Sequence, residues 1–258
     1  MNEVTTKLPV SVVIIASNEA KNLKRCLNSV YSWVSEIIVV INDCTDNTQQ
    51  IAESFQACVI EHPWEGYAAQ KNFAYTLATY DWILNLDADE EVSNALKQSI
   101  EQFFQLSNFN SYTTATCRRT NRYFQHWLKH TARESHHSIL LKKRAVHWEG
   151  LVHERLCFQG LTKPIAGSVL HYTEKTVQQT LSKQIKYAQL SAITLREKHT
   201  PSWLLLKAII NPWVSFFKHY IVHLGFLDGF AGFYYATINA YYTFLKYTFA
   251  LEQKNKNE

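Results

Sequence analysis

The sequence predicts an α/β fold with a mostly parallel sheet, followed by a helical C-terminal extension that is rich in aromatic residues. Two observations predict this class. In the first half of the 258-residue chain, short apolar runs rich in β-branched residues alternate with helix-like segments through short connections. From residue 201 to 250, by contrast, there are 15 aromatic side chains and only four charged ones, so the composition changes there.

The elements of the first half are expected in strict alternation. The apolar run VSVVIIA (10–16) is typical of a strand buried on both faces, and Ser17 suits the N-cap of the helix that follows. The expected strands are 10–16, 36–41, 57–62 and 81–86, and the expected helices are 18–31, 46–56, 67–79 and 93–105. Such alternation forms a parallel sheet with helices on both faces, and ligands bind outside the carboxyl ends of its strands.

The rest of the chain is predicted to be less regular up to residue 172. A strand is expected at 138–143, and residues 174–199 have apolar side chains at the helical spacings of three and four. We therefore expect one α/β domain at 1–175, divided into halves at 1–105 and 106–175, and a helical extension at 176–258.

Composition narrows the function classes. The formal net charge is only +4, which is too mild to indicate a nucleic-acid partner. The five cysteines are scattered without a C-x-x-C pair, so we do not expect a disulfide framework or a zinc module. This pattern predicts a reducing compartment. The N-terminus lacks a signal-peptide pattern. The absence of a Walker A motif and of G-x-G-x-x-G argues against a P-loop NTPase and a dinucleotide site.

The strongest local motif is Asp87-x-Asp89, at the end of an apolar strand. Two carboxylates there suit a hard divalent ion, and such an ion suits the departure of a diphosphate. The alternative is a solvated acidic loop that opens a helix. Polar clusters also follow the first two strands, at 17–19 and 42–43, and these favour the ligand-binding interpretation.

Four segments in order carry a resemblance to a known family: SVVIIASNEAKNLKRCLNSV, EIIVVINDCTDNT, HPWEGYAAQKNFA and DWILNLDADEEVS. They resemble the family-2 inverting glycosyltransferases, and the later VHERL and GFLDGFAGFYYATINAYYTFLKY resemble the bacterial branch that adds β-1,4-linked glucose to the inner core of lipopolysaccharide. The resemblance implies a GT-A type of fold, a UDP-sugar donor bound by the 1–105 half, an acceptor bound by the 106–175 half, and Mg²⁺ or Mn²⁺ as cofactor.

The resemblance also implies roles for single residues. Asn18 and Glu19 are placed at the nucleotide edge of the first strand, and Lys71 near the base or the diphosphate. Asp87 would face the ribose and phosphates, and Asp89 would ligate the metal ion. A cation near a diphosphate is physically useful, although Lys71 is equally compatible with a solvated helix position.

One departure from the family pattern concerns the base. Ile41 occupies the position where the family has an Asp that reads uracil, and Asn42 and Asp43 are shifted along the chain. Either Asp43 or Asn42 takes over this contact, or base selectivity is weaker. Asp46 is interpreted as a turn or capping residue.

The inverting reaction needs a general base for the acceptor hydroxyl. In HWEGLVHERL the resemblance points to Glu154, with Glu149 as the alternative base and an ion pair with a cation such as Arg155 as the structural alternative for Glu154. His153 is expected to orient Glu154 or to contact the acceptor. His171 is a candidate third metal ligand, although a lone histidine is more often a packed or surface residue.

The stretch 117–144 is basic, with Arg118 and Arg119 at its start. We expect it to bind an anionic glycolipid acceptor, because guanidinium groups suit carboxylates and phosphates; the alternative is a solvated face. No nucleic-acid module is recognisable.

The aromatic tail lacks about 20 consecutive uncharged apolar residues. Its aromatic side chains and scattered lysines suit a membrane interface, and the alternative is a helical subdomain that packs on the core or on a second copy. The combined prediction is a peripheral enzyme on the cytoplasmic face of the inner membrane. It would transfer a sugar, most simply glucose, to a lipopolysaccharide-core acceptor. Transfer to polyprenyl phosphate and a catalytically silent scaffold are the alternatives.

Overall fold

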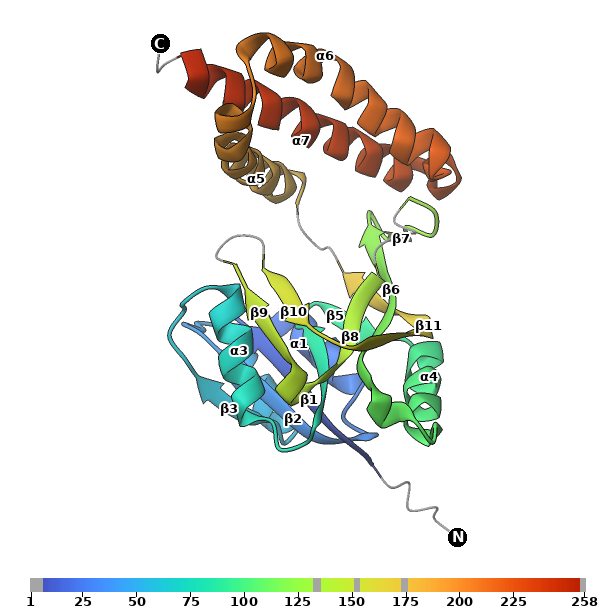
Figure 1. The fold of residues 1–258 in the computed structure, drawn as a ribbon. Coiled ribbons are helices and arrows are strands. Elements are labelled where there is room, and N and C mark those ends of the chain that lie inside the picture. The colour runs from blue at the N-terminus through green and yellow to red at the C-terminus, as the bar shows by residue number, and fades with distance from the viewer. Residues whose placement is uncertain (1–6, 132–135, 151–153, 173–175, 256–258) are drawn as a thin grey trace. The chain divides into compact units, whose positions relative to one another are not determined.

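The computed structural model describes residues 7–131, 136–150, 154–172 and 176–255. The chain forms two compact units (Figure 1). The first comprises residues 1–119 and 134–172, and the second comprises residues 120–133 and 173–258. Sequence analysis assigned 120–133 to the α/β domain, whereas in the structure this segment belongs to the unit that holds the C-terminal helices.

The first unit is built on a mixed sheet in the order β3-β2-β1-β4-β8-β6-β11-β5. Its parallel strands are β1 (Leu8–Ala16), β2 (Val34–Ile41), β3 (Cys58–Glu61) and β4 (Trp82–Asp87). The other strands are β5 (Glu90–Val92), β6 (Tyr112–Tyr123), β8 (His136–Lys142) and β11 (Leu161–Tyr172), which form the antiparallel pairs β4–β8, β8–β6 and β5–β11. The predicted α/β fold with a C-terminal helical region is confirmed.

Successive residues of a strand point to opposite faces of the sheet. Since the parallel strands carry apolar side chains on both faces, helices cover both. One core cluster joins Val12 and Ile14 of β1 to helices α1 (Ala20–Asn28), α2 (Thr48–Ser54) and α4 (Asn94–Gln105). The other joins Val13 to α3 (Tyr67–Leu77) and to the two-stranded sheet of β9 (Val146–Glu149) and β10 (Arg155–Phe158). The four parallel strands and the four helices lie within a few residues of the predicted ranges, whereas β9 and β10 were not predicted. The short β5 and the long β6 and β11 were not predicted.

A close approach between β11 and α4 fixes the far side of the sheet. Gly167 of β11 has a left-handed backbone (φ 89°), and a Cβ there would lie 2.3 Å from the backbone nitrogen of Leu96. Ser93, the N-cap of α4, accepts hydrogen bonds from the N–H groups of Leu96 and Ser168, both at 3.2 Å. β11 is thereby held against the helix that follows β5, which brings the end of β11 to the loop after β4.

The second unit is helical. It contains α5 (Val177–Lys198), α6 (Pro201–Phe217) and α7 (Gly229–Asn255), with a π-helical turn (Lys218–Val222) and a 3₁₀ turn (Gly225–Asp228) between the last two. The three helices share a small core in which Ala192, Ala208 and Ala250 permit close packing around Leu204 and Tyr247. In Figure 1, α6 and α7 run alongside each other.

The aspartate at the start of α7 ties residues 129–131 to the helices. Asp228 accepts hydrogen bonds from the backbone N–H groups of Lys129 (2.9 Å), His130 (3.0 Å) and Thr131 (2.9 Å), and from the Thr131 hydroxyl. The preceding short strand β7 (His126–Trp127) pairs with the end of β6. These contacts explain why residues 120–133 join the second unit.

Among the described residues, none of the helices alone has the length and apolar character to cross a membrane. The segments 201–222 and 225–254 meet these criteria only jointly, as a pair bent by 71°.

Candidate active site

The carboxyl ends of three parallel strands bring the predicted polar clusters to one edge of the sheet. Ile15 of β1 is paired with Asp87 at the end of β4, and the ends of β1 and β2 are also paired. Asn18 links the loops that follow β1 and β2, because its Oδ1 accepts hydrogen bonds from the backbone N–H (2.8 Å) and the hydroxyl (3.1 Å) of Thr45. The clusters after β1, β2 and β4 are therefore neighbours.

The loop after β2 carries Asp43 and Asp46 in different surroundings. Asp43 has a left-handed backbone (φ 44°), and its carboxylate accepts a hydrogen bond from the side chain of Asn42 (3.1 Å). Asp46 accepts hydrogen bonds from the backbone N–H groups of Thr48 (3.0 Å) and Ala20 (3.1 Å), at the starts of α2 and α1. Burial raises the pKa of Asp46, but these hydrogen bonds outweigh it and the net shift is downward. The interpretation of Asp46 as a capping residue agrees with this geometry.

Ile41 and Glu19 flank this edge. Ile41, which replaces the family's base-reading Asp, is only 4% exposed and belongs to the core. Glu19 precedes α1, and its N–H donates to the Thr48 hydroxyl (2.8 Å) while its carboxylate accepts from Asn22 (2.9 Å). The contribution of Asp43 or Asn42 to base recognition stays a prediction.

Asp87 lies between two cations. Its Oδ1 is 3.3 Å from Nζ of Lys71, and its Oδ2 is 3.2 Å from a terminal guanidinium nitrogen of Arg119. Burial raises the pKa of Asp87, but the charges of Lys71 and Arg119 dominate and hold it well below the usual range. Asp87 is therefore ionised, and it positions two cations beside the strand end where a diphosphate is predicted.

Glu90 is a buried member of the cluster that sequence analysis missed. It is 0% exposed, its carboxylate lies 2.7 Å from Nε of Arg119, and it accepts the backbone N–H of Asp87 (2.9 Å). Burial and the charge of Asp87 raise the pKa of Glu90 to about 7, against the opposing effect of Arg119. Burial lowers the pKa of the neighbouring His137 to about 4, so this imidazole is neutral at pH 7. In the sequence, the only signal for Glu90 was that it directly follows the Asp87-x-Asp89 motif. No sequence signal pointed to His137.

Asp89 meets His171 across the sheet. Nε2 of His171 lies 3.1 Å from Oδ2 of Asp89, and β11 brings them together by pairing with β5. An octahedral ion with bonds of about 2.1 Å holds neighbouring ligand atoms about 3.0 Å apart. One carboxylate oxygen and one imidazole nitrogen at this separation fit two adjacent positions on a single divalent ion, and this donor pair suits Mn²⁺ better than Mg²⁺.

The carboxylate of Asp87 does not join the Asp89–His171 pair. Among the described residues, the ligand atoms of Asp87, Asp89 and His171 do not all lie within 4.8 Å of one another. Asp87 thus belongs to the cation pair described above, while Asp89 and His171 form the candidate metal edge.

Lys71 connects this cluster to the β9–β10 hairpin. Its side chain is 7% exposed, and Nζ lies 4.6 Å from the centre of the Trp148 ring. Trp148 is in turn fixed on α3: its N–H donates to the side chain of Asn72 (2.8 Å), whose amide donates back to the Trp148 carbonyl (2.8 Å), and its indole N–H donates to the Tyr75 hydroxyl (3.0 Å). The low exposure of Lys71 therefore excludes the alternative that it is a solvated lysine on the helix surface.

The two carboxylates considered as bases lie on this hairpin. Glu154 is half-buried and directly precedes β10. Glu149, at the end of β9, is exposed and contacts His147 (2.8 Å) and Arg155 (3.6 Å). Among the described residues, Arg155 forms its ion pair with Glu149 and not with Glu154, the partner that the sequence analysis considered. His153 lies outside the described residues.

The predicted acceptor cations are dispersed. Arg119 belongs to the carboxylate cluster, and Arg118, its neighbour in β6, points to the other face of the strand. Lys142 donates to the Asn110 carbonyl (2.9 Å), and Lys143 donates to the Thr76 carbonyl (3.2 Å). An acceptor role for Arg118 and Arg119 stays a prediction.

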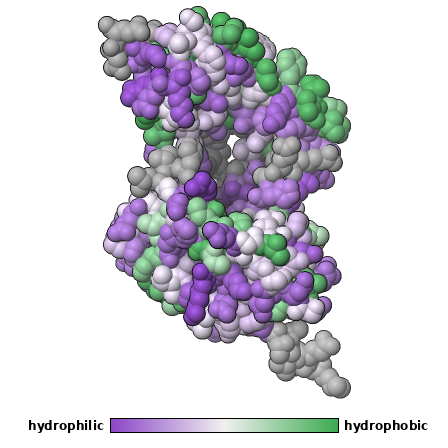
Figure 2. Space-filling model, in the orientation of Figure 1, coloured by the Kyte–Doolittle hydropathy of each residue, from purple (hydrophilic) through white to green (hydrophobic). Residues whose placement is uncertain are grey.

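The second unit exposes an apolar stripe along α6 and the π-helical turn that follows it. Exposed side chains recur at helical spacing, and the most exposed are Trp213 (66%) and Val222 (72%). Figure 2 shows hydrophobic side chains on the surface of this unit. The stripe consists of Leu205, Leu206, Ile209, Ile210, Trp213, Val214, Phe217, Ile221 and Val222.

Comparison with known proteins adds a family. The family model of glycosyl transferase family 2 matches residues 11–160. An uncharacterized glycosyltransferase of Rickettsia bellii is 31% identical over 95% of this chain and 87% of its own length. The lipopolysaccharide core biosynthesis glycosyltransferase LpsC of Rhizobium meliloti is 28% identical over 93% of this chain and 90% of its own. The crystal structure of glucosyl-3-phosphoglycerate synthase from Mycobacterium tuberculosis, in complex with Mn²⁺, uridine diphosphate and glucosyl-3-phosphoglycerate, superposes with a TM-score of 0.35 at 20% identity, over 44% of each chain.

Proposed function

This chain belongs to glycosyl transferase family 2, and we propose that it transfers glucose from UDP-glucose to the core of lipopolysaccharide with inversion at the anomeric carbon. The likeness to LpsC, named for lipopolysaccharide core biosynthesis, supports the acceptor class. The exposed apolar stripe of the second unit fits a lipid-linked acceptor.

One observation carries the proposal: an ionised Asp87 that holds Lys71 and Arg119, next to the Asp89–His171 pair at the same strand edge. A diphosphate needs cations on its oxygens and a divalent ion that bridges them. This edge offers the two cations and a candidate ligand pair for the ion, at the end of parallel strands where ligands of α/β sheets bind.

Each residue has a stated task in this proposal. Asn18 joins the loops after β1 and β2 and so shapes the nucleotide edge, where Asp43 is available to the base. Lys71 and Arg119 stabilise the diphosphate. Asp89 and His171 would hold Mn²⁺ or Mg²⁺, which when bound offsets the negative charge that grows on the departing diphosphate.

The acceptor hydroxyl loses its proton to a carboxylate on the opposite side of the sugar. We assign this task to Glu154, because it is half-buried and its described neighbour Arg155 pairs with Glu149 instead. Glu149 is the less suitable base, since its oxygens already contact His147 and Arg155. Transfer to a polyprenyl phosphate, whose nucleophile is already ionised, would need no base.

We further propose that the second unit rests on the cytoplasmic surface of the inner membrane. The large apolar side chains of the α6 stripe are exposed, and Lys207 and Lys218 lie beside them, where their ammonium groups can reach lipid phosphates. This arrangement would bring the enzyme to a membrane-anchored acceptor.

Ligand-induced stabilisation tests the donor. The melting temperature of the chain is measured with UDP-, GDP-, ADP- and dTDP-sugars, each with Mn²⁺ and with chelator. A ligand at 100 times its Kd adds about 2.7 kcal/mol of stability. We expect the largest shift with UDP-glucose and Mn²⁺, and a much smaller shift for Asp89→Ala. A larger shift with another base would contradict the uridine assignment, and no shift with any nucleotide-sugar would contradict the proposal.

A further inference from the structure

The β9–β10 hairpin has two chemically different faces. The strands pair antiparallel, with His147 opposite Cys157 and Trp148 opposite Leu156. Trp148 and Leu156 pack on the core cluster beneath the sheet, together with Val146. Because side chains alternate along a strand, the intervening residues project from the other face. One face of the hairpin is thus anchored, and the other is free to carry a site.

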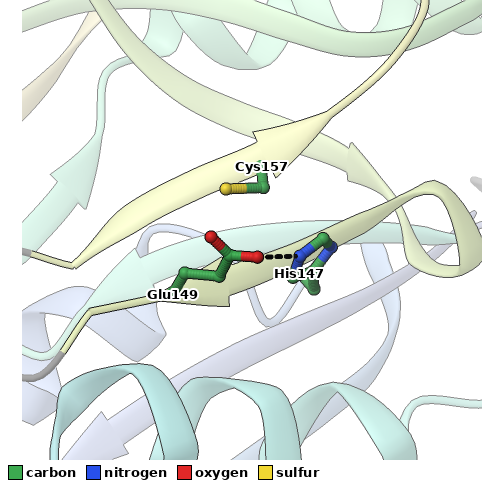
Figure 3. A group of neighbouring side chains, drawn as sticks. All are labelled: His147, Glu149 and Cys157. Carbon is green, nitrogen blue, oxygen red and sulfur yellow. Dashed lines mark hydrogen bonds and ion pairs between the residues drawn. The ribbon is translucent and has the colours of Figure 1, made fainter.

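Three potential metal ligands meet on that free face. His147 and Glu149 are two residues apart on β9, and Cys157 lies directly across from His147 on β10. Their ligand atoms, an imidazole nitrogen, a carboxylate oxygen and Sγ, all lie within 4.8 Å of one another. Figure 3 shows the three side chains gathered on one side of the two strands, with Glu149 reaching toward His147.

Small side-chain rotations would bring the three ligand atoms to the separations of a tetrahedral ion. Zn²⁺ binds nitrogen, oxygen and sulfur at about 2.0–2.3 Å, which places its ligand atoms about 3.3–3.8 Å apart. The side chains of His147 and Glu149 are 59% and 53% exposed, so they rotate into this range without movement of the anchored backbone. The ligand types separate this cluster from the Asp89–His171 pair, since a thiolate selects zinc-like ions whereas carboxylates suit Mg²⁺ and Mn²⁺.

We propose that His147, Glu149 and Cys157 bind one Zn²⁺ ion, with the fourth position open to water or to an oxygen of a bound molecule. The ion displaces the proton that Glu149 and His147 share and the proton of the thiol. Arg155 contacts the second carboxylate oxygen of Glu149 (3.6 Å) and the side chain of Cys157. Its own side chain is 78% exposed and screened by solvent, so it can turn away when an ion binds. Neither the resemblance nor the scattered cysteines predicted a zinc site.

Zinc here would cross-link β9 and β10, the two strands that flank residues 150–154. It would thereby fix the ends of the segment that carries Glu154. The site itself does not depend on the transferase assignment, because it rests on the hairpin alone.

The test is metal binding by the full-length chain after removal of metals with chelator. In an Asp89→Ala background, which lacks the carboxylate of the donor-edge metal pair, isothermal titration with Zn²⁺ should give one ion per chain that a chelator removes. Co²⁺ should give a thiolate-to-cobalt charge-transfer band. Cys157→Ser and His147→Ala should each weaken Zn²⁺ binding at least tenfold, because even substitutions of residues that only support a metal ligand weaken binding by about 10–100-fold. Cys157→Ser should also abolish the thiolate-to-cobalt band.

Matched variants distinguish this site from stray binding. Cys58→Ser removes another exposed cysteine, and Asp89→Ala removes the carboxylate of the donor edge. Cys58→Ser should bind Zn²⁺ like the wild type, and Asp89→Ala should keep the ion whose binding Cys157→Ser and His147→Ala weaken. Circular dichroism should show that all four variants are folded, because the substituted side chains are at least partly exposed. The proposal is overturned if the wild type binds no Zn²⁺, or if Cys157→Ser and His147→Ala bind it unchanged.

Discussion

Nε2 of His171 lies 3.1 Å from Oδ2 of Asp89, although 82 residues separate them in the chain. The pairing of β11 with β5 aligns them, and the Tyr172 N–H donates to the Asp89 carbonyl (3.0 Å) as the last bond of that edge. The contact of Gly167 with the start of α4 holds β11 in this register. A carboxylate and an imidazole are thereby presented as a pair at the end of the parallel strands.

His171→Ala should weaken the Mn²⁺-dependent stabilisation by UDP-glucose and leave metal-free stability near that of the wild type. The reason is that it removes one of two adjacent ligands while Asp89 remains. Thermal shift with titrated Mn²⁺ measures the effect, and His126→Ala, on an exposed histidine of the second unit, is the control. An unchanged Mn²⁺ dependence in His171→Ala would show that His171 is a packed residue and not a ligand.

Glu154→Gln should bind donor like the wild type and transfer sugar about 10²–10⁴-fold more slowly, because the amide keeps the shape but cannot take a proton. Glu149→Gln should have a much smaller effect, and Glu53→Gln, on the exposed face of α2, should have none. Single-turnover transfer rates separate the three. A dead Glu149→Gln with an active Glu154→Gln would reverse the assignment, and two active variants would favour a phosphate acceptor.

At pH of about 9, above the Glu90 pKa of about 7, Arg119→Met should lower the free energy of unfolding by about 3 kcal/mol, because it leaves the fully buried, ionised Glu90 without its cation. In a Glu90→Gln background the same substitution should cost clearly less, since the charge to be compensated is gone. Urea denaturation of the four proteins of this cycle measures the coupling. Arg144→Met, on an exposed arginine, is the control. Equal losses in both backgrounds would mean that the 2.7 Å contact contributes no coupling energy.

Asp228 predicts a pH dependence of the second unit. Burial raises its pKa, but the hydrogen bonds from residues 129–131 dominate and lower it, so its contribution to stability is present above the unfolded pKa of about 3.9 and is lost as the pH falls through the folded value. Asp228→Asn should therefore melt at a lower temperature than the wild type at pH 7, and the difference should shrink below pH of about 4. Asp81→Asn, a control in the first unit, should show no such convergence. A difference that stays constant down to low pH would contradict the role of the charge.

The α6 stripe predicts membrane binding. Leu206→Ser, Ile210→Ser and Val214→Ser together should reduce flotation with anionic liposomes more than tenfold, because each side chain gives about 1.5–3 kcal/mol on full burial. Three serine substitutions at Tyr31, Leu106 and Leu161, exposed apolar residues of the first unit, are the control. Removal of residues 200–258 should abolish flotation. A wild-type chain that stays with the soluble fraction and elutes as a dimer would identify the stripe as a subunit interface.

Local patterns predicted the parallel strands because buried strands of an α/β sheet read as continuous apolar runs, as in 10–16 and 36–41. The same patterns missed β6 and β11, whose polar and apolar residues alternate irregularly because their two faces meet different surroundings. Asp87 and Asp89 were singled out from a local motif, and Lys71 from the family resemblance. Glu90 and His137 were not, since their roles follow from burial beside Arg119, a contact that only the folded sheet creates.

Local sequence patterns also could not predict that residues 120–133 belong to the second unit. This assignment depends on hydrogen bonds from Lys129, His130 and Thr131 to Asp228, about a hundred residues further on. An aspartate in an aromatic, charge-poor segment reads as an interruption of an apolar run. In the structure it is the acceptor that attaches a distant loop to α7.

Transfer from radiolabelled UDP-glucose to a lipopolysaccharide inner-core oligosaccharide is the most direct test of the central claim. The wild type with Mn²⁺ should form a product in which the glucose is β-linked, as nuclear magnetic resonance of the anomeric proton would show, and Asp89→Ala should form none while remaining folded. Wild-type protein that consumes no nucleotide-sugar in the presence of Mn²⁺, or an Asp89→Ala variant that transfers at the wild-type rate, would contradict the account.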